Sequence, residues 1–395
     1  MKRISIAALL ALCFGHAEAQ SVKPRARDLG VPFEGTPGPG NAITDVAGVE
    51  VGHTTLISGD SVRTGVTVVL PEGKRGKNQV FAAWFTLNAD GEMTGTTWIE
   101  ESGILEGPVA ITNTHSVGTV HQAVIEYSVK NIEGLSWSLP VVAETWDGGL
   151  NDINGFHVKP EHVFAAIESA SGGPVVEGNV GGGTGMQVYQ FKGGIGTSSR
   201  VFEIDGRRYT VGVLVQANYG LRPQLRVAGV PVGLEIPDLT PEGPDQSDEP
   251  DEPDEPDEND EDVENEEDED GSIIIVVATD APVLPHQLKR IAKRASLGLG
   301  RNGSIASNGS GDIFIAFSTF HKNIGTEEGG LYDLKMLGNS DLNPIFRATV
   351  EASEEAVINA MVAAETMTGK GGTRVYAIPH DRLREALRKY NRLAP

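Results

Sequence analysis

Short apolar runs recur along the chain, separated by polar and glycine-rich segments. They consist mainly of Val, Ile, Ala and Phe with few polar positions, which is typical of strands buried on both faces of a sheet. This pattern predicts strands at residues 65–70, 80–85, 109–112, 210–216, 272–279, 312–318 and 374–378.

Longer stretches between these runs have the spacing of helices. They are predicted at residues 117–129, 160–169, 285–299 and 351–367. Helices that alternate with buried strands indicate a layered α/β fold.

The alternation stops in an acidic, low-complexity insertion at residues 237–270, which contains a repeat of Glu, Pro and Asp. Like charges repel and proline blocks regular pairing, so the insertion is predicted to be disordered. A calcium-binding interpretation is weaker, because no Asp-x-Asp-x-Asp-Gly loop occurs. Neither flank resembles a complete domain, so we expect one α/β domain that the insertion interrupts.

The net charge of −23 comes largely from this insertion. Residues 245–270 hold 18 acidic residues and no basic ones, which leaves −5 for the rest of the chain. The sequence therefore lacks the basic surface of proteins that bind nucleic acid or anionic membranes, and neither partner is expected.

Residues 1–19 resemble a signal peptide. Lys2 and Arg3 precede an apolar run, which is too short to span a bilayer, and Ala17–Ala19 fits a cleavage site. We expect an exported protein, periplasmic or secreted, that starts near Gln20. The only cysteine, Cys13, lies in this leader, so the mature chain is expected to lack disulfides and thiol chemistry. A lipoprotein anchored at Cys13 is the alternative, but Leu12 stands where a small residue is expected.

The junction Gly271–Ser272 joins the acidic insertion to a strongly β-branched run. Cleavage of this bond would give Ser272 both a hydroxyl nucleophile and a free α-amine that can act as its general base. The alternative is a strand that merely begins with Ser after a linker, and the local sequence does not decide between them.

Other polar side chains also lie where predicted strands begin or end. Ser310 and Asp312 precede an apolar strand and have the chemistry of a hydroxyl–carboxylate relay. Asn218 ends another strand, where its amide can donate to a developing oxyanion. Each of these patterns is also common in ordinary turns.

Glu144 and Trp146 end a third apolar run, where a carboxylate can bind a substrate ammonium and an indole can wall a pocket. His115 is a weaker candidate for a base. The glycine-dense segment 181–185 lacks the strand–turn–helix context of a nucleotide-binding loop, and no metal-binding motif occurs, so no metal or cofactor is expected.

Taken together, these motifs resemble the DmpA/BapA-type β-aminopeptidases, also described as L-aminopeptidase/D-amino-acid esterases. The resemblance extends from about Arg27 to the C-terminal helix. It is carried by Gly48–Thr54, Thr112–Ser116, Ala143–Asp147 with Asn151–Asp152, Val213–Asn218, Gly271–Ser272 with Ala278–Pro282, and Asn308–Asp312.

The resemblance implies a self-processing serine hydrolase of the N-terminal-nucleophile (Ntn) type. Its fold would be a four-layer αββα sandwich formed by two chains from one precursor, an α-chain (20–271) and a β-chain (272–395). Ser272 would be the nucleophile, Ser310 and Asp312 its relay, and Asn218 the oxyanion donor. Glu144 would hold the substrate's ammonium; Trp146 stands where some members have Tyr, so a hydroxyl contribution is not expected there.

The function expected from the sequence is hydrolysis of the amide bond after an unblocked N-terminal residue in small peptides, or in amino-acid amides or esters. The family also implies a homotetramer of processed units. Two alternatives stay open: an acyltransferase of related fold, and a non-catalytic, calcium-responsive surface protein built around the acidic insertion.

Overall fold

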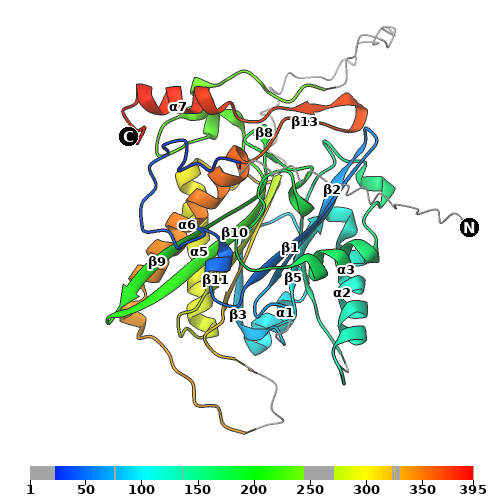
Figure 1. Ribbon diagram of the computed structural model, residues 1–395, viewed down its shortest axis with the longest axis vertical. Coiled ribbons are helices and arrows are strands. Elements are labelled where there is room, and N and C mark those ends of the chain that lie inside the picture. The colour runs from blue at the N-terminus through cyan, green and yellow to red at the C-terminus, as the bar shows by residue number, and fades with distance from the viewer. Residues whose placement is uncertain are drawn as a thin grey trace, which may run out of the picture.

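The computed structural model describes residues 23–74, 77–135, 137–243, 271–322, 324 and 330–394. Two β-sheets pack face to face and each is covered by helices on its outer face (Figure 1). The predicted signal segment, Cys13 and residues 244–270 of the acidic insertion lie outside the described residues.

The larger sheet has six strands in the order β4-β3-β12-β11-β10-β9. Their bounds are Gln79–Ala89 (β3), Ile104–Glu106 (β4), Gly194–Ile204 (β9), Arg207–Asn218 (β10), Gly271–Thr279 (β11) and Ser310–Ser318 (β12). β11 pairs in parallel with β12 and antiparallel with β10. Strands that follow the acidic insertion therefore lie inside a sheet whose outer strands precede it, as the single-domain prediction requires.

The smaller sheet has four strands, β1 (Glu50–Ser58), β2 (Val62–Leu70), β5 (Val109–Asn113) and β6 (Val141–Thr145). Helices α2 (Val117–Asn131) and α3 (Pro160–Ser169) pack on its outer face, and α5 (Pro285–Asn302) and α6 (Asn343–Val362) cover the larger sheet. The shorter elements are α1 (Thr96–Ser102), α4 (Val232–Glu235), α7 (His380–Lys389), β7 (Gln187–Val188), β8 (Phe191–Lys192), β13 (Met367–Thr368) and β14 (Arg374–Val375). The predicted αββα architecture is confirmed.

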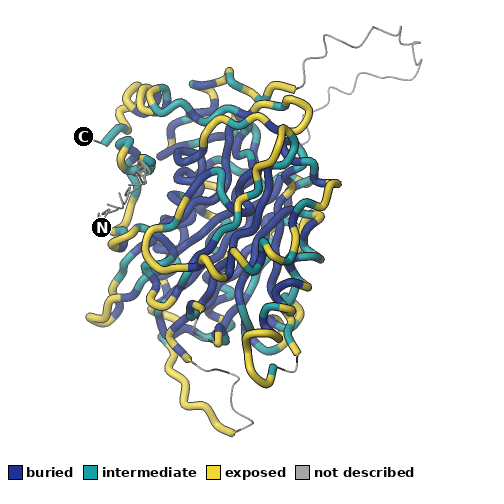
Figure 2. The backbone as a smooth tube through the Cα atoms, turned by 45° about the vertical axis from the view of Figure 1, so that its right-hand side comes forward, coloured by how far each residue is buried: buried dark blue, intermediate teal, exposed yellow. Residues whose placement is uncertain are grey.

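Three apolar clusters fill the three spaces between the four layers. Along β11, Ile273 and Ile275 face the helices α5 and α6, while Ile274 and Val276 face the other sheet. Because successive strand residues point to opposite faces, an unbroken apolar run is what a strand between two cores requires. Figure 2 shows the buried strands running through the interior, with exposed residues concentrated in loops and helix surfaces.

Most predicted elements are present, with two corrections. The helix predicted at 351–367 runs from Asn343 to Val362. It can begin this early because Pro344 lies in its first turn, where the missing N–H of proline would have no helical partner in any case. The last predicted strand, 374–378, is paired only at Arg374 and Val375. β1 and β9 were not predicted, since both mix polar residues into the run.

The acidic insertion begins later than predicted. Residues 237–243 are held on the body of the protein: Arg222 donates to the carbonyl oxygens of Asp238 and Leu239, and Glu242 pairs with Arg374 through two backbone hydrogen bonds. The prediction of disorder from Pro237 was wrong for these seven residues, because buried Arg222 supplies the donors that bind the backbone of this segment.

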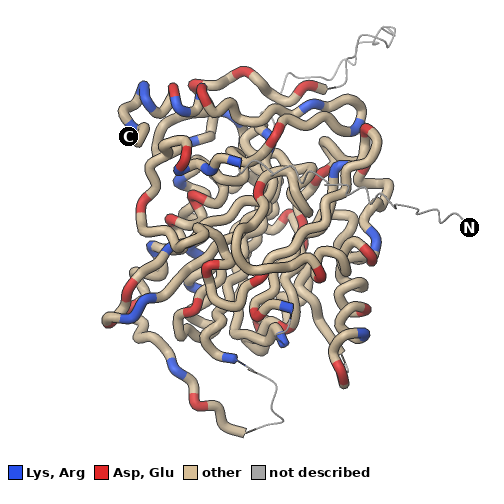
Figure 3. Tube along the Cα trace, viewed as in Figure 1, with Lys and Arg blue, Asp and Glu red and all other residues tan. Residues whose placement is uncertain are grey.

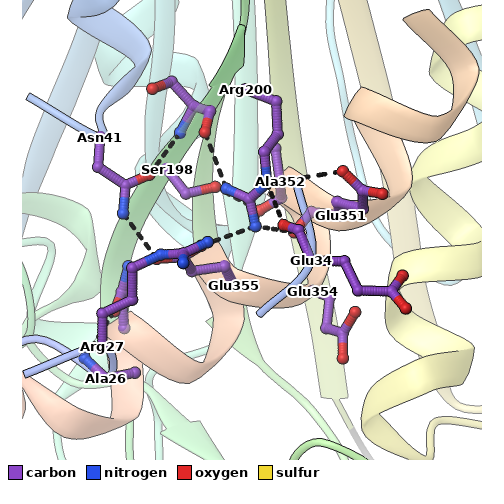
Figure 4. A network of polar contacts seen from close by, with 12 residues as sticks. Ala26, Arg27, Glu34, Asn41, Ser198, Arg200, Glu351, Ala352, Glu354 and Glu355 are labelled. Carbon is purple, nitrogen blue, oxygen red and sulfur yellow. Dashed lines mark hydrogen bonds and ion pairs between the residues drawn. The ribbon is translucent and has the colours of Figure 1, made fainter. Parts of the chain in front are cut away.

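A buried ion-pair network ties the N-terminal segment to β9 and α6 (Figure 4). Glu355 accepts hydrogen bonds from Arg27 Nε at 2.8 Å and Asn41 Nδ2 at 2.6 Å, and pairs with Arg200 Nη2 at 2.7 Å. Burial alone would raise the pKa of Glu355, but Arg27 and Arg200 lower it below its usual value. Both charges of the Arg200–Glu355 pair are thus compensated inside the fold.

Charged residues of both signs are interspersed over the rest of the described trace (Figure 3). Among the described residues, no helix is both long and apolar enough to cross a membrane.

Candidate active site

Ser272 is the second residue of β11 and is 4% exposed. It pairs with Asn218 on β10 and with Gly311 on β12, so two neighbouring strand ends flank it. Its Oγ donates a hydrogen bond to the carbonyl oxygen of Gly271 at 2.6 Å. The hydroxyl therefore lies beside the carbonyl group of the bond that the sequence predicts to be cleaved.

Glycine is required at position 271 by the approach of β10. A Cβ there would lie 2.8 Å from the carbonyl oxygen of Asn218 and 2.9 Å from Cα of Tyr219. Any side chain would thus push the Gly271–Ser272 peptide away from its neighbouring strand.

A cavity of about 350 Å³ opens above Ser272. Gly271, Ser272 and Gly309 form its side on the larger sheet. The ends of β5 and β6 contribute Thr114, Glu144 and Trp146, and residues 90–92 close a third side. The cavity thus brings together strand ends from both sheets.

Glu144 is a buried carboxylate on the part of the wall that the smaller sheet contributes. It accepts a hydrogen bond from the Thr114 hydroxyl and another from the Glu92 backbone N–H at 2.9 Å. Burial raises the pKa of Glu144; the two hydrogen bonds oppose this, and the nearby charges of Glu92 and Asp90 add to it. Such a carboxylate gains most from a bound cation, which would replace the solvent it has lost.

Asn218 is oriented by its neighbours. The backbone N–H of Gln187 donates to Asn218 Oδ1 at 2.8 Å. This fixes which end of the amide is the acceptor and leaves both Nδ2 protons available as donors. The predicted oxyanion donor is therefore held in one orientation beside Ser272.

Ser310 and Asp312 form a second buried pair on β12. Ser310 Oγ donates to Asp312 Oδ1 at 2.8 Å, and Ser310 pairs in register with Gly271. No hydrogen bond joins Ser310 to Ser272 within the described part of the chain. The two residues predicted as a relay thus form a pair beside the Gly271–Ser272 peptide, with Ser310 one residue from Ser272 in register.

The structure separates the remaining candidates. Trp146 lines the cavity and is 48% exposed, as a pocket wall requires. His115 is exposed, stacks on Phe156 and does not line the cavity, so the structure gives no support for it as a base.

Sequence reasoning missed Asp147, which organises the loop after β6. It is buried and accepts hydrogen bonds from Nδ2 of Asn113 at 3.1 Å and of Asn151 at 3.0 Å. Burial raises the pKa of Asp147 to about 6. Its position directly after Trp146 was visible in the sequence, but nothing there marked this carboxylate as buried.

The sequence profile of peptidase family S58 matches residues 41–375. The chain belongs to peptidase family S58. It is 54% identical to the β-peptidyl aminopeptidase BapA of Sphingosinicella microcystinivorans over 97% of this chain and 96% of that protein. It is 51% identical to BapA of Sphingosinicella xenopeptidilytica, over 93% of this chain and 92% of that protein.

Solved structures of the family have the same fold. The L-aminopeptidase D-Ala-esterase/amidase of Ochrobactrum anthropi, described as a variant of the Ntn-hydrolase fold, superposes with a TM-score of 0.83 at 46% identity, covering 94% of this chain and all of the other. A Burkholderia β-aminopeptidase gives 0.80 at 44% identity, over 93% of this chain and 99% of the other. The family resemblance inferred from the motifs is confirmed, and this S58 protein is a serine aminopeptidase of the Ntn type.

Proposed function

We propose that this S58 protein first cleaves its own Gly271–Ser272 bond and then uses the freed Ser272 to hydrolyse the amide bond after an unblocked N-terminal residue. The observation that carries the proposal is the position of Ser272 Oγ, beside the Gly271 carbonyl and at the base of a cavity walled by Glu144. A nucleophile and an ammonium-binding carboxylate then face one cavity.

Self-cleavage would begin with attack of Ser272 Oγ on the carbonyl carbon of Gly271. The C–N bond breaks, the nitrogen takes up a proton, and Gly271 becomes esterified to the serine. Water then hydrolyses the ester, leaving a carboxylate at Gly271 and a free α-amine at Ser272. That amine supplies the general base for later turnovers.

Substrate hydrolysis would repeat this chemistry on another chain. Glu144 holds the substrate's ammonium, and Ser272 Oγ attacks the first amide carbonyl while its proton passes to the α-amine. Asn218 Nδ2 donates to the oxyanion, and the Ser310–Asp312 pair lies beside the amine to assist the proton transfer. The leaving amine departs with a proton, and water hydrolyses the acyl-enzyme.

The substrates proposed are small peptides, amides or esters that begin with a β-amino, D- or L-residue. The named activities of the Sphingosinicella and Ochrobactrum relatives support this class. We further propose that the protein is made as an exported zymogen, periplasmic or secreted, and works as a homotetramer of processed units.

The direct test of processing is intact-mass spectrometry of the purified protein under denaturing conditions. We expect two fragments, one starting near Gln20 and one starting at Ser272. A single mass for the uncleaved chain in active protein would exclude the proposed processing.

Replacing Glu144 by Gln is expected to raise KM by about tenfold to a hundredfold, since a hydrogen bond to a charged partner contributes about 1.5–3 kcal/mol. In the wild-type enzyme the raised pKa means that the carboxylate is charged above this pKa and protonated below it. KM should therefore rise as the pH falls through the pKa of Glu144, which lies above the ordinary Glu pKa of 4.5.

KM measured against pH for an aminoacyl p-nitroanilide checks both effects. Glu92→Gln is the matched control, because it removes a neighbouring carboxylate but keeps the backbone N–H that binds Glu144. If Glu144→Gln keeps the wild-type KM and still shows the rise in KM at low pH, another group binds the ammonium.

A further inference from the structure

Residues 181–194 form one stretch that begins with the glycine-dense segment 181–185 noted in the sequence. This stretch contains a 3-10 turn (Gly181–Gly183) and the β7–β8 hairpin, and it leads into β9 at Gly194. Lys192, near its end, is 0% exposed. A fully buried lysine is costly for a fold unless its ammonium is well solvated by the protein.

The ammonium of Lys192 is bound by three backbone carbonyl oxygens. Nζ donates to Met186 O at 2.7 Å, to Gly193 O at 2.9 Å and to Gly183 O at 3.4 Å. Within the described residues no carboxylate pairs with it. Burial and the charge of Lys23 lower the pKa of Lys192 to about 7, whereas three acceptors match the three protons of an ammonium and favour the charged form.

One of these carbonyls leads directly to the proposed oxyanion donor. The C=O of Met186 and the N–H of Gln187 belong to the same planar peptide group. That N–H donates to Asn218 Oδ1 at 2.8 Å. Lys192, one peptide group and the Asn218 amide therefore form an unbroken chain of hydrogen bonds, which ends at the Nδ2 donors of the residue that pairs with Ser272 in the sheet.

We propose that Lys192 is a positioning residue for the oxyanion site, which both orients the Met186–Gln187 peptide and polarises it toward Asn218. A cation at one end of such a chain withdraws electron density through each bond, so the last donor becomes a stronger one. The inference rests on the proposed role of Asn218 as oxyanion donor.

If Lys192 acts by polarisation, its removal should lower kcat and leave KM nearly unchanged. Glu144 holds the substrate ammonium from the other sheet, so ground-state binding does not pass through Lys192. We expect Lys192→Met, which replaces the lysine by an uncharged side chain one atom shorter, to lower kcat by about tenfold with KM nearly unchanged, as for weakening a charge-assisted bond.

A double-mutant cycle with Asn218→Ala separates this role from a merely structural one. In the Asn218→Ala background, Lys192→Met should change kcat by less than about twofold, because the chain then has no donor to polarise. A persistent tenfold loss in that background, or an unchanged kcat in the single Lys192→Met variant, would overturn the proposal. If Asn218→Ala alone leaves kcat unchanged, it is the proposed oxyanion donor that fails.

Arg200→Met is the matched control, since it also removes a fully buried cation, but from the ion-pair network with Glu355. It should lower the melting temperature and leave kcat of the folded enzyme unchanged. A fall in kcat there equal to that of Lys192→Met would mean that lost stability explains both, against the proposal.

Should Lys192→Met not fold, the wild-type enzyme still decides the question. In protein labelled at glutamine nitrogen, the Gln187 amide proton resonance should shift with the same inflection as the titration of the Lys192 side chain. A Gln187 amide chemical shift that stays constant while the Lys192 side chain titrates would overturn the proposal.

Discussion

Ser272→Ala is expected to leave the chain uncleaved at Gly271–Ser272 and to lower peptide hydrolysis by a factor on the order of 10⁶, as for loss of a serine nucleophile. The variant removes the only hydroxyl hydrogen-bonded to the Gly271 carbonyl among the described residues. It also leaves no free α-amine, because without cleavage the nitrogen of residue 272 stays in a peptide bond. Nucleophile and base are thus lost in one substitution.

Denaturing mass spectrometry and hydrolysis of an aminoacyl p-nitroanilide measure the two losses. Ser340→Ala, at an exposed serine, is the control and should be processed and active. Retained hydrolysis by uncleaved Ser272→Ala protein would show that another group is the nucleophile.

Asn218→Ala is expected to lower kcat by about 10²–10³, the usual result of removing one oxyanion donor. KM should change little, because the interaction forms only as charge develops on the carbonyl oxygen. Self-cleavage should slow as well, since the same amide lies beside the Gly271–Ser272 peptide.

The isosteric variant Asn218→Asp sharpens this test. It keeps an acceptor for the Gln187 N–H but has no Nδ2 protons to donate. Single-turnover kinetics should show a loss at least as large as that of Asn218→Ala. If Asn218→Asp retains wild-type kcat, the side chain serves only to hold the segment at Gln187.

The apolar pattern was sufficient to predict a layered α/β fold because the buried strands are long enough to stand out, whereas the αββα arrangement was implied by the family resemblance. β11 and β12 are almost wholly apolar after their first residues, and a strand between two cores has no polar face to conceal it. β9 escaped prediction because its buried positions include Thr197, Ser198 and Arg200. Their partners lie in segments remote in sequence, so no local pattern shows that they are satisfied.

The candidate site was predictable only where a side chain ends or begins a strand. Asn218, Glu144 and Ser272 met this condition: Asn218 pairs with Ser272 in the larger sheet, and Ser272 and Glu144 line one cavity. The hydroxyl of Thr114 and the carboxylate of Asp147 were not assigned roles, because their importance depends on which side chains meet at the ends of the neighbouring strands β5 and β6. Lys192 looks like an ordinary surface lysine in the sequence, and only burial reveals it.

Because β11 lies between β10 and β12, the segments before and after the Gly271–Ser272 bond share one sheet. In the processing we propose, cutting the Gly271–Ser272 bond would leave two pieces that share one sheet but are no longer tethered. The precursor folds in a unimolecular reaction, whereas separated pieces would have to find each other, at a rate set by their concentration. The uncut chain would therefore refold without a partner. After cleavage, unfolding in dilute solution would be irreversible, because the separated pieces rarely meet.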